Sequence, residues 1–358
     1  MPIILTPSSG TVTTPTVTAD GTTAIIMPAG TTAQRPATPA AGMVRLNTTL
    51  GYPEWYSATY TSWLPFGTTT LYTQKAIFGY GYTTVNVSMT NLVSNTGVVA
   101  TDTTGVGTAR GYLAATGYGI DKAIFGYGIT SVVVSMSNLV SNTGVVATDT
   151  TGVGSARGYL AAASYGIDKA IFGFGYIASS TAITNLVSNT GVIATNTAGV
   201  GQIRFGLAAA GYGLDKAIFG YGINASPLSL TNLVSNAGVV ATDTTGVGTA
   251  RAYLAAAGYG GDKAIFGYGS NNAGTYYSLT NLVSNTGVVA TDTTGVGTAR
   301  HYLAAAGYGS DKAIFGYGAT GSNLSMTNLV SSTGVVATDT TGVGTARYSL
   351  AAASYSLS

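Results

Sequence analysis

The phrase "GYGIDKAIFGYGI" occupies residues 117–129, and close variants of it recur through the rest of the chain. Its lysine marks the register of the copies, which stand at Lys75, Lys122, Lys169, Lys216, Lys263 and Lys312. Successive lysines are 47 residues apart four times and 49 residues apart at the last step. A constant period of this length is typical of propellers and other repeat arrays. The copies are rich in Gly, Thr, Val, Tyr and Ser and carry frequent turn signals, which favours strands over helices.

One complete repeat predicts four strands, at residues 110–119, 122–128, 133–141 and 144–150. The "SNTG" phrase between the last two is a hairpin signal. The strand at 122–128 is apolar on both faces, as expected for a sheet packed between two others. The strand at 110–119 is built largely from Ala and Gly, which suits a crowded position beside a central axis.

The two ends of the array predict how it closes. The repeats begin at a second strand, at Lys75, and end with a first strand at residues 347–358. If this last strand pairs with residues 75–81, the array forms six blades without an exposed edge. Gln74 stands where the other copies have Asp, as expected where the chain is interrupted.

The repeats also carry a family pattern. Arg110 opens a first strand, a turn containing Gly117 and Gly119 follows, and the second strand ends in Gly126-Tyr127-Gly128. In these features residues 72–358 resemble the kelch family of β-propellers. A tyrosine splits the glycine pair, and glycine replaces the usual tryptophan after strand three. The resemblance therefore implies the topology, an all-β six-bladed propeller of about 47-residue repeats closed by the C-terminal strand, rather than an inherited function.

Residues 1–71 differ in composition and predict a separate segment. Eight of the nine prolines, both tryptophans and the only glutamate lie before residue 67. Residues 43–67 contain β-formers, turn signals and aromatic residues that look exposed, so we expect a few short strands there. The remainder is expected to be extended chain that becomes ordered only against a partner.

Charged residues are few and form regular ladders within the repeats. An Asp-Lys pair opens the second strand in five copies, for example Asp121-Lys122. A second ladder pairs an Asp with an Arg eight residues later, with Asn196 in the Asp position of one copy: Asp102, Arg110, Asp149, Arg157, Asn196, Arg204, Asp243, Arg251, Asp292, Arg300, Asp339 and Arg347. Because these groups recur in every blade, we expect a structural role, with the Asp and Arg tying the loop between blades through an ion pair or backbone hydrogen bonds.

The residue inventory argues against an enzyme. There is one histidine, His301, at a position that varies between copies, and there is no cysteine. The copper site of kelch-fold oxidases therefore cannot be built, and a lone His at such a position is expected to be a surface residue. The Asp residues are repeated ladders rather than a differentiated carboxylate pair. The glycine-rich phrases lack the lysine of a phosphate loop. We expect no catalytic residues, no cofactor and no metal.

The overall charge limits the partners. Charged residues make up 7% of the chain, the net charge is +2, and no basic run exists, so we expect neither a nucleic-acid partner nor membrane insertion. The N-terminal residues lack the pattern of a secretory signal. We expect a soluble or particle-bound protein without its own export signal.

Differences between the copies point to a binding surface. The link between strands two and three differs in every copy, as does the residue after each arginine, whereas the turns at the opposite end are nearly uniform. In an up-and-down blade both variable positions emerge on one face, which predicts a binding face rich in Asn, Ser, Thr and Tyr. Neutral drift of exposed loops is the alternative. The candidate ligand-binding residues are Tyr82, Asn86, Tyr176, Asn224, Asn271, Asn272, Tyr276, Tyr277, His301 and Asn323. Their composition favours a neutral glycan.

Residues 30–67 carry a second resemblance, through Gln34, Arg35, Pro36, Pro39, Gly42, Met43, Arg45, Asn47, Glu54, Tyr56 and Trp63. This pattern is similar to a segment found in tail fibres and other host-attachment proteins of bacteriophages. The resemblance implies a virion tail fibre assembled in the host cytoplasm, most often a homotrimer, whose residues 1–71 attach to other tail or baseplate proteins. The C-terminal domain would then bind a host surface glycan or receptor. A structural virion decoration or spacer, or a depolymerase-type enzyme, are the alternatives.

Overall fold

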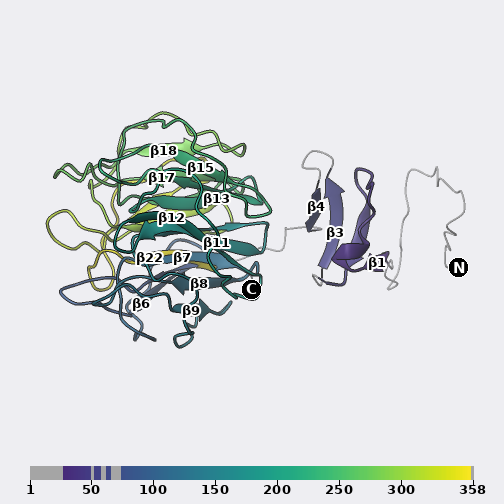
Figure 1. Cartoon of the computed structure of the whole chain (residues 1–358), viewed down its shortest axis with the longest axis horizontal. Helices are drawn as coiled ribbons and strands as arrows, with labels where there is room; N and C mark the ends of the chain where they lie inside the picture. The colour runs from purple at the N-terminus through teal and green to yellow at the C-terminus, as the bar shows by residue number, and fades with distance from the viewer. Residues whose placement is uncertain (1–26, 50–51, 58–61, 66–73, 356–358) are drawn as a thin grey trace, which may run out of the picture. The chain divides into compact units, whose positions relative to one another are not determined.

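The computed structural model describes residues 27–49, 52–57, 62–65 and 74–355. The chain divides into two compact units, Met1–Leu71 and Tyr72–Ser358. Throughout these described ranges the regular structure is β, apart from one turn of 3-10 helix at Thr32–Gln34. Figure 1 labels the strands of both units.

The first unit contains one four-stranded sheet in the order β1-β2-β3-β4. Its strands are β1 (Ala29–Gly30), β2 (Val44–Asn47), β3 (Tyr52–Ser57) and β4 (Ser62–Pro65). The first pair is parallel and the other two pairs are antiparallel. The short strands expected within residues 43–67 are therefore present, while residues 1–26 of the expected extended chain lie outside the described ranges.

A buried carboxylate organises this sheet. Glu54 is fully buried, and its carboxylate lies 2.6 Å from Arg35 and 3.4 Å from Arg45. Asn47 donates a further hydrogen bond to it at 3.0 Å. Burial alone would raise the pKa of Glu54, but these hydrogen bonds and the two positive charges outweigh it and lower the pKa. Trp63 is buried rather than exposed, because its ring packs 5.7 Å from that of Tyr56, so the expectation of an exposed tryptophan here was wrong.

The second unit consists of six three-stranded antiparallel sheets. The inner strand of each sheet is β7 (Ala114–Tyr118), β10 (Ala161–Tyr165), β13 (Ala208–Tyr212), β16 (Ala255–Tyr259), β19 (Ala304–Tyr308) or β22 (Ala351–Tyr355). The middle strand is β8 (Lys122–Gly126), β11 (Lys169–Tyr176), β14 (Lys216–Gly220), β17 (Lys263–Gly267), β20 (Lys312–Gly316) or β5 (Lys75–Gly79). The third strand is β9 (Ser137–Val140), β12 (Ser180–Val187), β15 (Thr231–Val234), β18 (Thr280–Val283), β21 (Thr327–Val330) or β6 (Thr90–Val93).

The expected fourth strand is not formed, and this part of the prediction was wrong. Residues 144–150 meet the third strand only at isolated bridges, Val140 to Val146 and Ser137 to Thr150. The Asn138 side chain donates to the carbonyl of Ala147 at 3.0 Å, so a side chain takes an acceptor that a continuous ladder would use. The first two strands are also shorter than expected, because Tyr112 and Tyr127 have left-handed backbone, with φ of 56° and 62°.

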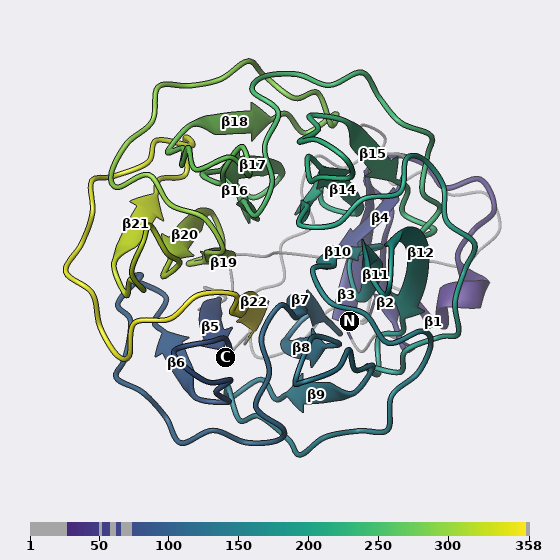
Figure 2. The same ribbon diagram turned by 60° about the vertical axis from the view of Figure 1, so that its left-hand side comes forward.

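Strands from opposite ends of the unit share one sheet. β22 pairs antiparallel with β5, with Tyr355 opposite Lys75 and Ala351 opposite Gly79. The inner strands contact one another in the cyclic order β7, β10, β13, β16, β19, β22 and back to β7. Figure 2 shows the six sheets placed around a common centre. The last strand therefore completes the sheet that the first repeat begins.

The apolar core lies between neighbouring sheets. In the middle strand β8, Ala123, Ile124 and Phe125 are all fully buried, as its unbroken apolar run predicts. Gly126 ends this strand where a Cβ would lie 2.7 Å from Cζ of Phe172 in the next sheet. Only glycine allows the two sheets to approach this closely. The same middle-strand phenylalanine and following glycine recur in all six sheets, so the packing repeats around the centre.

Candidate functional site

Each repeat buries one arginine completely between two sheets. Arg110 donates to the carbonyls of Tyr127 and Thr108 at 2.8 and 3.0 Å and to the side-chain oxygen of Asn138 at 2.7 Å. Its guanidinium also lies 4.4 Å from the ring centroid of Tyr80 in the preceding sheet. Matching contacts are made by Arg157, Arg204, Arg251, Arg300 and Arg347. Each guanidinium nitrogen of Arg110 therefore has a hydrogen-bond acceptor inside the protein. The buried arginines thus stabilise the packing of the sheets.

The aspartate ladder contacts a different arginine from the expected one. Asp149 lies 3.8 Å from Arg110, which opens the same repeat, and not beside Arg157, which opens the next one. The carboxylate accepts hydrogen bonds from the backbone N–H and hydroxyl of Thr108 at 2.9 and 2.6 Å, and from Asn138 at 2.9 Å. The corresponding ion pairs are Asp102–Arg347, Asp243–Arg204, Asp292–Arg251 and Asp339–Arg300. The seven intervening residues lead into the next sheet, which separates the two groups that are close in sequence.

Asn196 shows that this position depends on hydrogen bonding. Its side-chain oxygen accepts from the backbone N–H of Ser155 and from Asn185, both at 3.1 Å, and its amide donates to the hydroxyl of Ser155 at 2.8 Å. In Asp149, burial opposes ionisation, but the hydrogen bonds from Thr108 and Asn138 and the charge of Arg110 outweigh burial and lower the pKa. The charged Asp149 and the neutral Asn196 therefore hold equivalent loops in two different repeats.

The two kinds of variable position lie side by side at one end of the sheets. The residue after each arginine forms an isolated bridge with the first residue of the link between strands two and three. These bridges are Gly111–Ile129, Gly158–Tyr176, Phe205–Ile223, Ala252–Ser270, His301–Ala319 and Tyr348–Tyr82. The hairpin turns between inner and middle strands lie at the opposite end, because those two strands are antiparallel. We call the end that carries the bridges the variable end.

Aromatic rings connect these bridges across the variable end. The ring centroids of Tyr82 and Tyr348 are 5.4 Å apart, those of Tyr176 and Phe205 are 5.2 Å apart, and those of Tyr276 and His301 are 4.6 Å apart. The ring centroid of Phe205 also lies 5.6 Å from that of Tyr159, and the ring centroid of Tyr348 lies 5.7 Å from that of Tyr302. Aromatic contact thus runs from the links to the centre of the variable end.

At that centre the backbone closes a ring of six hydrogen bonds. Each member donates its N–H to the carbonyl of the equivalent residue one repeat earlier, over 2.7–2.9 Å, through Tyr112, Tyr159, Gly206, Tyr253, Tyr302 and Ser349. All six have left-handed backbone, with φ between 53° and 61°. At Gly206 a Cβ would lie 2.6 Å from Cε1 of Tyr253, so glycine here makes room for the neighbouring tyrosine. A cavity of about 80 Å³ is lined by these residues and the leucines that follow them.

His301 belongs to this aromatic cluster and is not the surface residue that was expected. It is half-buried, with Tyr302 and Tyr253 at ring distances of 4.4 and 6.3 Å in addition to Tyr276. Its Nδ1 is buried without a hydrogen-bond partner. Burial lowers the pKa of His301 to about 4, so the imidazole is neutral near pH 7.

Several candidate asparagines are used by the fold. Asn86 donates to the carbonyl of Thr130 at 3.0 Å, and Asn323 donates to the carbonyl of Thr83 at 3.1 Å, so both connect neighbouring links. Asn271 accepts two backbone N–H groups of its own link, and Asn224 accepts from the hydroxyl of Ser180 at 3.2 Å. Asn272 is exposed with a left-handed backbone, and Tyr277 is half-buried. Asn86, Asn323, Asn271 and Asn224 therefore have hydrogen-bond partners within the protein.

The described ranges contain no cluster of three or more His, Asp or Glu side chains that could hold a metal ion. Within the same ranges, no helix has the length and apolar character needed to cross a membrane.

The left-handed tyrosines are the part of this surface that we did not predict from the sequence. They occupy the second position after the arginine in four of six copies, and this recurrence was the available signal. The Ala-rich run that follows each of them suggested only that the strand lies near the centre. The closed hydrogen-bond ring depends on contacts between copies, which one repeat does not reveal.

Comparison with known proteins finds no family model that matches this chain. It also finds no curated protein whose sequence matches it.

Proposed function

We propose that residues 72–358 form a kelch-like six-bladed β-propeller that binds a neutral glycan at its variable end, and that the protein is a host-attachment protein of a bacteriophage tail. The cyclic order of inner-strand contacts and the pairing of β22 with β5 support the propeller. The arginine of every repeat and the Gly-Tyr-Gly element, which is Gly-Phe-Gly at residues 173–175, support the kelch-like assignment, because they meet at each junction between sheets.

One observation carries the binding proposal: aromatic side chains concentrate where the copies differ. The pairs Tyr82–Tyr348, Tyr176–Phe205 and Tyr276–His301 each join a variable link to a variable residue after an arginine. Tyrosine offers a large rigid contact surface at low entropic cost together with a hydroxyl for hydrogen bonding. The neutral imidazole adds a polar group without charge. These properties suit uncharged sugar rings better than anionic ligands.

The first unit supports the tail-fibre proposal through its internal contacts. Arg35, Arg45, Asn47 and Glu54, which carry the resemblance to phage host-attachment proteins, form a single buried cluster. These matched residues thus contact one another within the sheet of the first unit. We propose that residues 1–71 attach to other tail or baseplate proteins, that the protein is a homotrimer located in the virion, and that it has no enzymatic turnover.

The proposal is tested by glycan-array binding of the full chain, with Tyr176→Ala and Tyr348→Ala as variants. We expect binding to neutral host-surface glycans, reduced about tenfold or more in each variant, since each loses an aromatic contact surface. Val145→Ala is the matched control, because Val145 is exposed in a turn at the opposite end. Absence of glycan binding would favour a structural decoration, and release of reducing sugars would indicate a depolymerase. Equal binding by all variants would place the site elsewhere.

A further inference from the structure

The opposite end of the second unit has a cavity of about 310 Å³ that is lined by all six inner strands. Each inner strand is an edge strand of its sheet, so backbone N–H and C=O groups remain available on the side away from the middle strand. This volume lies within the range of small-molecule sites. The cavity is separate from the variable end, because the hairpin turns that border it lie at the other end of the antiparallel strands.

The rim of this cavity departs from the repeat symmetry. The turn residue before the Asp-Lys pair is Ile120, Ile167 and Leu214 in three successive repeats, and Gly261 and Ser310 in the next two. All five residues line the cavity. The three apolar side chains remain 47%, 37% and 47% exposed. One side of the rim is therefore apolar and the other side is small or polar.

The backbone conformation of these three apolar residues is unfavourable for the stability of the fold. Ile120, Ile167 and Leu214 have left-handed φ of 66°, 75° and 72°, a conformation that disfavours bulky and β-branched residues. Gly261 adopts the same conformation, with φ of 78°, without that strain. The left-handed tyrosines elsewhere are largely buried, so their packing offsets the strain. The partly exposed side chains of Ile120, Ile167 and Leu214 gain less packing of this kind, and backbone strain of this sort is typical of sites that contact a ligand.

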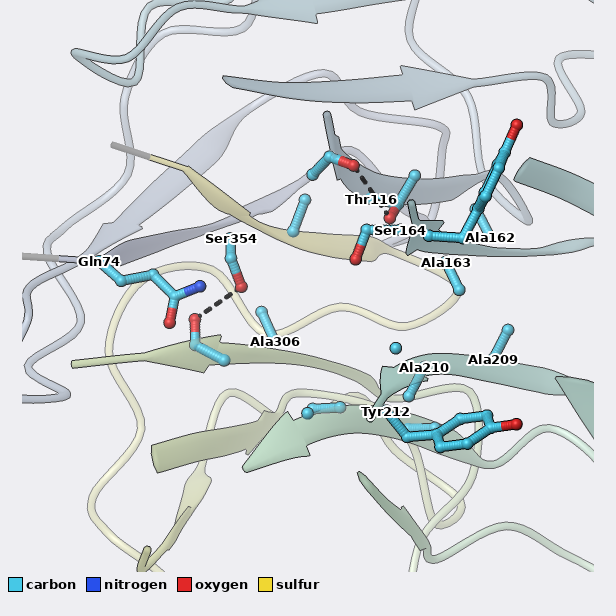
Figure 3. A pocket seen from close by; sticks show the side chains of 18 of the residues that line it. Gln74, Thr116, Ala162, Ala163, Ser164, Ala209, Ala210, Tyr212, Ala306 and Ser354 are labelled. Atoms are coloured by element: carbon cyan, nitrogen blue, oxygen red, sulfur yellow. Dashed lines mark hydrogen bonds between the residues drawn. The ribbon is translucent and has the colours of Figure 1, made fainter. Parts of the chain in front are cut away.

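The interior departs from the symmetry on the same side. Thr116, Ser164 and Ser354 place hydroxyls on β7, β10 and β22, three strands that are consecutive around the centre (Figure 3). Ser354 donates to the carbonyl of Gly307 at 2.8 Å. The other three inner strands, β13, β16 and β19, present only Ala-Ala-Ala-Gly before their tyrosine. Hydroxyls inside and apolar side chains at the rim thus overlap on β7 and β10.

The charges at the rim are internally neutralised. The ammonium groups of Lys122, Lys216 and Lys263 lie 2.6–3.0 Å from the carboxylates of the aspartates that precede them. A charged ligand would have to compete with these pairs, whereas an uncharged ligand would not.

We propose that this cavity is a second binding site, for a neutral sugar ring that carries an apolar substituent. The sugar hydroxyls bond to the side-chain hydroxyls and strand edges inside, and the apolar substituent contacts Ile120, Ile167 and Leu214 at the rim. The inference is independent of the glycan site proposed for the variable end.

Isothermal titration calorimetry of the full chain tests the site with butyl β-D-glucopyranoside as the probe. Glucose provides the sugar ring of the probe without the butyl chain, and 1-butanol provides the butyl chain without the sugar ring. Sodium glucuronate provides a sugar ring with a negative charge. We expect the butyl glucoside to bind about tenfold or more tightly than any of the three comparison compounds, because only it satisfies both sides of the cavity without charge. Absence of binding, or equal binding of glucose, butanol or glucuronate, would overturn the proposal.

The informative variant is the triple change Ile120→Gly, Ile167→Gly and Leu214→Gly. Glycine suits the left-handed turns, so we expect an unchanged or higher melting temperature together with about fivefold or greater loss of affinity from the lost apolar contact. The triple change Val98→Ala, Val145→Ala and Val192→Ala is the matched control, since it removes exposed apolar atoms that do not line the cavity, and we expect it to leave the affinity unchanged. Unchanged affinity in the triple glycine variant contradicts the site. Loss of affinity in Tyr176→Ala instead would assign the probe to the variable end and would equally overturn the proposal.

Discussion

Tyrosine in a left-handed backbone is uncommon, yet most copies of this repeat use it twice. Tyr127 illustrates the reason. It is fully buried, its ring lies 5.2 Å from that of Phe172, and the guanidinium of Arg157 lies 4.3 Å from it. A buried cation over an aromatic ring contributes about 2 kcal/mol, comparable to the cost of the conformation. The tyrosine that interrupts the glycine pair is therefore part of the junction between sheets.

At Asp149 we predict that hydrogen-bond acceptance matters more than charge. Asp149→Asn is expected to cost at most about 1 kcal/mol, because Asn196 shows that an amide can hold the equivalent loop. Asp149→Leu is expected to cost about 2–4 kcal/mol, since the donors on Thr108 and Asn138 lose their acceptor. Thermal unfolding of both variants measures this difference. Equal losses in the melting temperature would contradict the prediction.

The pH dependence provides the control. The pKa of Asp149 is lowered in the folded state, so the contribution of its charge is present above the unfolded pKa of about 3.9 and is lost as the pH falls through the folded-state pKa. Asn does not titrate. The stability difference between wild type and Asp149→Asn should therefore shrink as the pH is lowered below about 4.

At the scale of single elements, the middle strands and the segments after the third strands differ in the number of backbone pairs that hold them in place. β8 is paired on both sides and is buried, whereas residues 144–150 meet β9 only through isolated bridges. The apolar run of the middle strand was readable from the sequence. The alternation of residues 144–150 also suggested a strand, but the sequence did not show that Asn138 would bond to the Ala147 carbonyl.

Amide hydrogen exchange should separate these two elements. We expect the amides of β8 to exchange at least about a hundredfold more slowly than most amides of residues 144–150, because strand pairing on both sides and burial raise the free energy of local opening. β17 is a matched internal reference, since it has the same sequence and the same burial pattern as β8. Equal protection in the two elements would mean that the fourth segment is as firmly held as a regular strand.

At the scale of the whole molecule, the sequence predicted what depends on order along the chain. The period, the β content and the pairing of the last strand with residues 75–81, of which residues 75–79 pair in the structure, follow from counting the copies. Contacts between copies were harder to predict. Asp149 pairs with Arg110 at the start of its own repeat rather than with Arg157 in the next one, because the chain moves on to the next sheet after Asp149. The hydrogen-bond ring through Tyr112 and its equivalents appears only when six repeats meet. The candidate binding residues were found by variation, which does not show that Asn86 and Asn323 are used by the scaffold.

Removal of β22 tests the closing contact. A chain ending at Leu350 leaves β5 without its inner partner and removes Tyr355, whose side chain is buried against Ile77 and its neighbours. We expect a stability loss above about 5 kcal/mol and a tendency to aggregate through the exposed edge. Removal of residues 356–358 alone keeps every β22 pair and serves as the control. Circular dichroism and size-exclusion chromatography provide the readout, and native-like behaviour of the chain ending at Leu350 would contradict the prediction.

The pairing of β22 with β5 also affects how the protein is made. Tyr355 is synthesised 280 positions after Lys75, its partner in the register. At ribosomal rates of about 5–20 residues per second, the partner of β5 emerges roughly 15–60 s after β5 itself. During this interval the nascent chain carries an apolar strand with an unsatisfied side. Synthesis of β22 therefore sets the earliest time at which the second unit can form its native pairing, and factors that shield nascent chains would have most to contribute during this interval.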